Sequence, residues 1–134
     1  MATNFTPSWQ AKVGINHVGA YQVSGQPYAS AGIECDDATV VEFPYVTRWV
    51  RIVNLDNSVL RVGFSEIGVS GSNYFSVQAN EETPPLELKV SQLWLYSPGN
   101  ANSVCDVVAG LTSIEVDRCS GSAGPSWSGS SGVG

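Results

Sequence analysis

Val46-Thr47-Arg48-Trp49-Val50-Arg51-Ile52-Val53-Asn54 is the strongest strand signal in the sequence. β-Branched and aromatic side chains dominate this run, and both kinds fit the pleated, half-buried surface of a sheet. The run therefore predicts a central β-strand over 46–54. Leu55-Asp56-Asn57-Ser58 follows directly, and its Asp, Asn and Ser are typical turn residues, which predicts a hairpin turn.

Short apolar or alternating runs continue on both sides of this stretch, separated by Gly, Pro, Asn, Asp and Ser. They predict seven further strands, over residues 19–24, 39–43, 60–64, 73–77, 86–90, 93–96 and 104–109. Gly25-Gln26-Pro27 is expected to be a turn, and residues 68–72 a loop. No segment of ten or more residues has the 3.6-residue apolar period of a helix, so helix should be minimal.

Eight strands at a spacing near ten residues, in a chain of 134 residues, predict a single all-β domain. The expected architecture is a two-sheet antiparallel sandwich of jelly-roll or Greek-key type, with an up-and-down barrel as the competing closure. We place the sandwich at 19–119 and extended arms at 1–18 and 120–134. Because the C-terminal arm is uncharged and rich in Ser and Gly, it should become ordered only against a neighbouring subunit.

Charge and composition limit the partners of the chain. The formal net charge is -6, and the six Lys and Arg residues are scattered, which argues against binding to nucleic acid. The first residues lack the basic region and apolar run of a secretory signal, and no stretch is long enough to span a membrane. We therefore expect synthesis in a cytoplasm and no membrane partner.

The residues that could carry chemistry form no recognisable catalytic or metal motif. Cys35, Cys105 and Cys119 are odd in number and widely spaced, which favours unpaired thiols. His17 is the only histidine, so a small hydrolase would lack a credible general base. Glu34, Asp36 and Asp37 could ligate a hard cation such as calcium, but we interpret them as a solvated acidic turn, and ion binding stays open. No catalytic residue, metal or cofactor is assigned.

The four tryptophans are the more informative functional candidates. Trp49 and Trp94 lie within predicted strands and are interpreted as core residues. Trp9 and Trp127 lie in the polar ends of the chain, where isolated aromatic rings suit anchors at a protein interface. With Phe5 and Val133, they form the predicted partner interface. The same aromatic residues, with loops rich in Ser, Asn and Gly, leave a carbohydrate-binding or receptor-binding module as an alternative.

A resemblance to a known group of proteins is carried by the predicted strands. Five stretches resemble, in local sequence, small virion structural proteins of tailed bacteriophages, especially marine and cyanobacterial phages. They are residues 41–50, 60–65, 73–75, 86–90 and 108–114. The resemblance implies a capsid decoration or cement protein on the virion surface. It also implies binding to the major capsid protein and to copies of itself, as a homotrimer. A tail, portal or head-fibre accessory protein is the alternative within this group.

Overall fold

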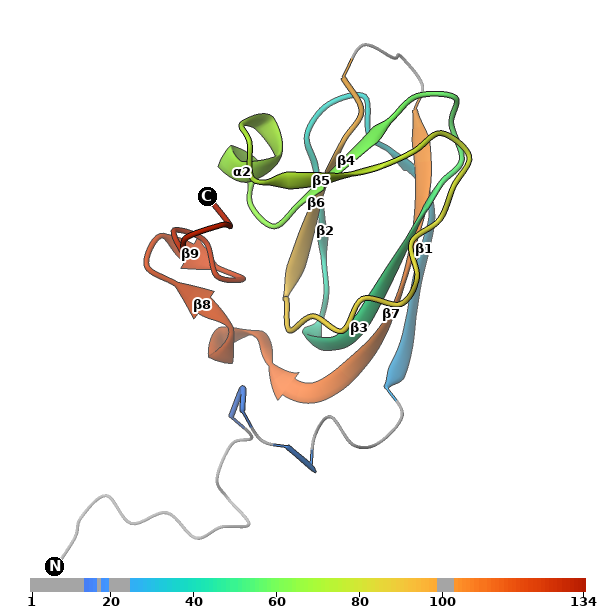
Figure 1. Cartoon of the computed structure of the whole chain (residues 1–134). Coiled ribbons are helices and arrows are strands. Elements are labelled where there is room, and N and C mark those ends of the chain that lie inside the picture. The colour runs from blue at the N-terminus through green and yellow to red at the C-terminus, as the bar shows by residue number, and fades with distance from the viewer. Residues whose placement is uncertain (1–13, 17, 20–24, 99–102) are drawn as a thin grey trace, which may run out of the picture.

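The computed structural model describes residues 14–16, 18–19, 25–98 and 103–134, and these form two antiparallel sheets packed face to face (Figure 1). The first sheet has the order β1-β7-β3, with β1 at Gln26–Glu34, β7 at Val104–Glu115 and β3 at Tyr45–Asn54. The second has the order β2-β6-β4-β5, with bounds Thr39–Glu42, Gln92–Tyr96, Leu60–Gly63 and Tyr74–Val77. The predicted all-β, two-sheet sandwich is confirmed.

Four short elements complete the described structure. A single-turn helix, α2 (Glu66–Ser70), follows β4, and a 3-10 turn, η1 (Val116–Arg118), follows β7. A small hairpin, β8 (Ser120–Gly121) and β9 (Gly124–Pro125), comes near the C-terminus.

The path of the chain between the sheets is that of a jelly roll. Residues 81–90 lie along the free edge of β3, through the antiparallel bridges Val53 to Glu82 and Val50 to Leu86. With this edge segment counted, the first sheet has the order β1-β7-β3-edge segment, against β2-β6-β4-β5 in the second. The chain crosses between the sheets at every step except β4 to β5, which is the connectivity of two interleaved Greek keys.

Alternation along the strands builds the core between the two sheets. Val50 and Ile52 of β3 face Leu60 and Val62 of β4, and all four are fully buried. Strand β7 adds Cys105, Val107 and Ala109 to the same cluster, while β6 adds Leu93 and Leu95. A second core cluster, made of Val46, Ile114 and Cys119, lies where β3, β7 and the C-terminal residues meet.

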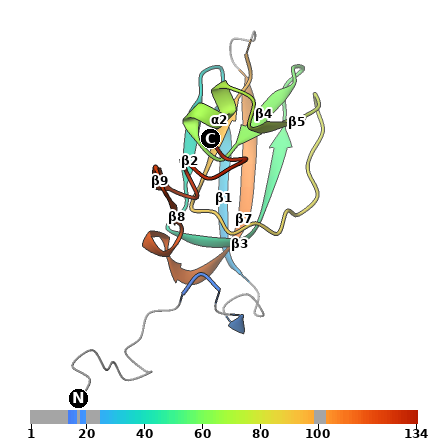
Figure 2. The same ribbon diagram turned by 60° about the vertical axis from the view of Figure 1, so that its left-hand side comes forward.

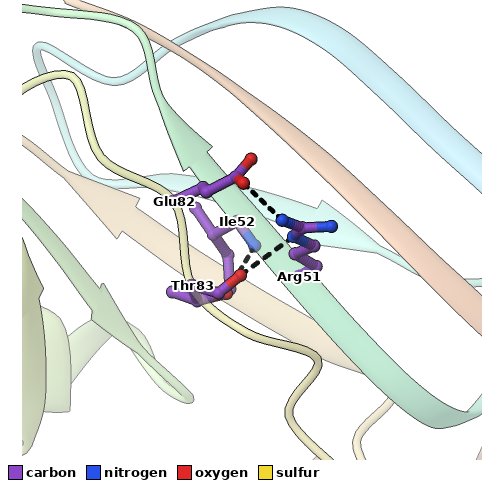
Figure 3. Close-up of polar contacts among 4 residues, drawn as sticks. All are labelled: Arg51, Ile52, Glu82 and Thr83. Atoms are coloured by element: carbon purple, nitrogen blue, oxygen red, sulfur yellow. Dashed lines mark hydrogen bonds and ion pairs between the residues drawn. The ribbon is translucent and has the colours of Figure 1, made fainter.

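The edge segment 81–90 is not the regular strand that its alternation predicts at 86–90. Pro84 and Pro85 have no backbone N–H to donate to a ladder. Further along the segment, the Thr47 side chain makes bonds that the backbone of β3 would make in a regular ladder. Thr47 Oγ1 donates to the Leu88 carbonyl at 2.6 Å and accepts from the Val90 amide at 3.1 Å. Nearer the other end of the segment, Arg51 pairs with Glu82 and donates to the Thr83 carbonyl, as Figure 3 shows. Irregular pairing of this kind covers the edge of β3, so that a strand of another chain cannot pair with it.

Three other predictions on local structure are corrected. Gln26 and Pro27 begin β1 instead of forming a turn, because Pro27 lies in an edge strand where a missing amide is tolerated. Strand β7 continues past Ala109 to Glu115. Residues 68–70 of the loop predicted at 68–72 belong to α2 (Glu66–Ser70), whose first turn is capped by Ser65 Oγ accepting from the Gly68 amide. Of the predicted strand 19–24, residues 20–24 lie outside the described residues.

Candidate functional site

The C-terminal segment, residues 120–134, folds back onto the body of its own chain. Ser126 is fully buried, and its Oγ accepts from the Ser91 amide at 3.1 Å, at the start of β6. The backbone of Ser126 and Trp127 is left-handed, with φ of 54° and 67°. These strained conformations persist because surrounding contacts hold them. They turn the chain so that Trp127 points into the body.

Trp127 anchors this segment at its centre. The indole Nε1 donates to the Lys89 carbonyl, and the ring packs against both core clusters. Further along, the Val133 carbonyl accepts from Ser65 Oγ at 2.7 Å, the same hydroxyl that caps α2. The C-terminus therefore lies beside α2, as both views show (Figures 1 and 2).

These contacts change the interpretation of the predicted arms. The segment 120–134 is not an arm extending away from the body, because hydrogen bonds at Ser126 Oγ, at Trp127 Nε1 and at the Val133 carbonyl fix it in place. Within the predicted arm 1–18, Ile15 packs against the second core cluster, and Asn16 Oδ1 accepts from Lys89 Nζ at 3.2 Å. Phe5 and Trp9 lie outside the described residues, so only Trp127 and Val133 of the predicted interface can be placed.

Trp127 and Val133 line the same apolar groove. Its volume is about 360 Å³, and its other apolar walls are Phe64, Leu88 and Val90, with Glu87 and Lys89 at the edge segment. A second groove of about 620 Å³ lies beside it, formed by Arg48, Trp49, Pro85 and Leu86 together with the shared residues Glu87 and Leu88. Residues 85–90 thus carry a groove on each side, and we call this region the edge-segment surface.

Only part of the edge-segment surface could be predicted from the sequence. Phe64 and Leu88 alternate as core residues do, and both are half-buried because the groove interrupts the packing around them. Trp49 and Trp94 are not core residues, in contrast to the prediction. Trp49 precedes the fully buried Val50 in β3, and Trp94 lies between the fully buried Leu93 and Leu95 in β6. Both tryptophans therefore occupy outward positions of their strands. Trp49 instead lies over Gly110, where any Cβ would collide with its indole.

The three cysteines are buried and unpaired thiols. Burial raises the pKa of the Cys119 thiol to about 11. Cys35 and Cys105 interact with each other: the hydrogen bond from Cys105 lowers the pKa of Cys35, and the same bond, aided by burial, raises the pKa of Cys105. His17 lies outside the described residues.

The acidic residues form no metal site in the part of the chain that the structure describes. There, no three His, Cys, Asp or Glu side chains gather into a set that could hold an ion. Glu34, Asp36 and Asp37 are exposed around the buried Cys35, as a solvated turn would be. Within the same residues, no helix is long and apolar enough to cross a membrane.

Comparison of the chain with protein-family models, with curated proteins and with solved structures found no match.

Proposed function

We propose that this chain is a structural protein of a tailed-bacteriophage virion. Its role would be that of a decoration protein, which binds the assembled capsid and stabilises it by bridging coat subunits. The proposal rests on the likeness of its strands to virion proteins and on a surface suited to binding. The jelly-roll fold agrees with this role, but only by analogy, since capsid and lectin domains share it with many other proteins.

The edge-segment surface is the observation that carries the proposal. Two apolar grooves lie side by side, and one segment, 85–90, supplies a wall to both. Enzyme sites bring several polar groups together in a pocket, whereas the groove at Trp127 offers only Glu87 and Lys89 beside five apolar side chains. Grooves of this kind accept the large aromatic side chains that contribute much of the binding energy at protein interfaces.

The mechanism is added interface area on the assembled shell. A ligand that binds only the assembled state stabilises it by RT ln(1 + [L]/Kd), about 2.7 kcal/mol per site at a hundredfold excess over Kd. Because a shell presents many equivalent sites, a modest gain at each site accumulates. Rigid β-sandwiches, held by two buried clusters, would fix the spacing of the subunits that they bridge.

The copy number of the chain in purified particles tests the proposal. Quantitative mass spectrometry of particles from the phage that carries this gene should find hundreds of copies, which is the stoichiometry of a capsid surface. A dozen copies or fewer would replace decoration by a tail, portal or head-fibre role. Absence from the particle would overturn the proposal as a whole. A glycan array run in parallel would then test the carbohydrate-binding alternative.

A further inference from the structure

The outer face of the second sheet carries a cluster of Arg and Tyr side chains that the proposed function does not use. Leu60 and Val62 of β4 point into the core, so Arg61 and Gly63 point outward. Arg61 stands opposite Ser76 of β5 and Tyr96 of β6, and Gly63 stands opposite Tyr74 and Trp94. Three neighbouring strands therefore place Arg61, Tyr74 and Tyr96 on one face.

The two tyrosine rings hold the Arg61 guanidinium between them. Its central carbon lies 4.4 Å from the centroid of the Tyr74 ring and 5.8 Å from that of the Tyr96 ring, within the range of cation–π attraction. All three side chains are half-buried. A guanidinium that uses its planar faces for ring contacts keeps its N–H edge free for hydrogen bonds in the plane.

Arg61 has a charge without a counter-charge in the described part of the chain. Arg51, on β3, forms an ion pair with Glu82, whereas no described carboxylate pairs with Arg61. The neighbouring helix limits the face, since Val69 of α2 packs against Gly63 so closely that a Cβ there would lie 2.9 Å from the Val69 Cβ. Trp94, on the same face, has a buried Nε1 without an acceptor among the described residues. This face thus carries two donor groups without a partner of their own: the Arg61 guanidinium, which has no described carboxylate beside it, and Trp94 Nε1.

We propose that Arg61, held by Tyr74 and Tyr96, is an anchor for a carboxylate side chain of an acidic protein partner. A carboxylate matches the two parallel N–H groups of the guanidinium edge. Arg, Tyr and Trp are also the residues enriched at the energetic centres of protein interfaces. Nucleic acid fits less well, because it needs a stripe of basic side chains and the six Lys and Arg residues of this chain are scattered. The inference does not depend on the phage assignment.

Titration of the full chain with a tetraglutamate peptide at low salt, followed by NMR, tests the anchor. The ring resonances of Tyr74 and Tyr96 should shift, and added salt should reverse the shift. Arg61→Gln should weaken binding about tenfold or more, since it removes a charged hydrogen-bond donor. Arg61→Lys keeps the charge but loses the planar edge, so its affinity for the peptide should lie between those of the natural chain and Arg61→Gln. Circular dichroism confirms that each variant is folded.

A matched control separates the anchor from general charge attraction. Arg118 is exposed on η1 and lies outside the second sheet, so Arg118→Gln makes the same change in net charge. It should leave peptide binding unchanged. Equal losses in the Arg61 and Arg118 variants, or no shift of the Tyr74 and Tyr96 rings, would overturn the proposal. Tighter binding of trigalacturonate than of tetraglutamate would also overturn it, and would favour an acidic saccharide.

Discussion

Thr47 is the residue on which the pairing of the edge segment depends. It is fully buried, and its hydroxyl serves both the Leu88 carbonyl and the Val90 amide. Its own amide donates to the Val90 carbonyl at 3.0 Å. One side chain of β3 therefore satisfies two groups of the edge segment that a regular ladder would have paired with backbone groups of β3. The position needs a hydroxyl of this size, and not merely a β-branched residue.

Thr47→Val should lower the free energy of unfolding by about 2 to 3 kcal/mol, because it leaves a buried carbonyl and a buried amide without partners. Urea denaturation measures the loss. Thr39→Val is the matched control: Thr39 Oγ1 can donate to the carbonyl of Glu34 or of Asp37, each at 2.9 Å, but the site is exposed and water can replace this bond. Its cost should stay below about 1 kcal/mol. Equal losses at the two positions would contradict this account.

Cys119 gives the fold a dependence on alkaline pH. Burial raises the pKa of its thiol from 9.0 to about 11, so the folded state favours the neutral form. The resulting stability is fully present below pH 9 and is lost as the pH rises through 11. Cys119→Ala should be less stable than the natural chain at pH 8, through lost packing, and the difference should shrink towards pH 11. A difference that stays constant over this range would exclude the effect.

At the scale of the elements, the sequence pattern predicted the bounds of four strands closely. The strand predicted at 46–54 is β3 at 45–54, and those at 60–64, 73–77 and 93–96 agree with β4, β5 and β6 within one residue at each end. In β3, β4 and β6, buried Val, Ile and Leu residues two positions apart leave little choice of face or period. These strands could therefore be predicted without knowledge of their neighbours.

The elements that sequence reasoning missed depend on distant contacts. The strand predicted at 104–109 stopped before Gly110, whereas β7 continues through this glycine to Glu115. Glycine is needed there because the Trp49 indole lies against its Cα. α2 contains Gly68, which packs against the Val133 backbone from the far end of the chain. The Ser65-Glu66 pair at its start, a helix cap followed by an acidic residue, was the one local signal available. No local pattern shows that Thr47 replaces a ladder bond.

The C-terminal segment was the least predictable element, since its composition indicated an arm. Contacts with the body of its own chain hold it in place, among them the packing of the Trp127 ring against the core and the bond from Ser65 to the Val133 carbonyl. Sequence reasoning identified Trp127 and Val133 as anchors, but it could not tell that their contacts lie within the same chain. Neither residue carries a local signal of its partner, because Lys89 and Ser65 are 38 and 68 positions away.

Trp127→Ala should therefore destabilise the isolated chain by about 3 kcal/mol, at the low end for a large aromatic residue because the ring is half-buried. Chemical denaturation followed by circular dichroism measures the change. Ser131→Ala, at an exposed position of the same segment, should change it by less than about 0.5 kcal/mol. If Trp127→Ala had no effect, the segment would behave as the free arm expected from its composition.

At the scale of the whole molecule, the two sheets present surfaces of different character. The edge-segment surface is apolar and grooved, whereas the outer face of the second sheet presents the Arg61 cluster. The groove walls and the Arg61 cluster share no residue, so they are distinct surfaces. A molecule with two separate contact surfaces can bridge two neighbours, which is the property that a decoration protein requires.

A substitution at Leu88 can distinguish binding to the particle from folding. The side chain lines both grooves, whereas the bond to Thr47 is made by the backbone carbonyl and would be kept. Leu88→Glu should leave a folded chain, because the residue is half-buried, but it should reduce occupancy on purified particles about tenfold, as a charge desolvated at an interface does. Leu55→Glu is the control: Leu55 is 49% exposed, follows β3 and lines neither groove. Its occupancy, measured by mass spectrometry, should equal that of the natural chain. If both variants bind the particle equally well, contact with the shell does not pass through the edge-segment surface.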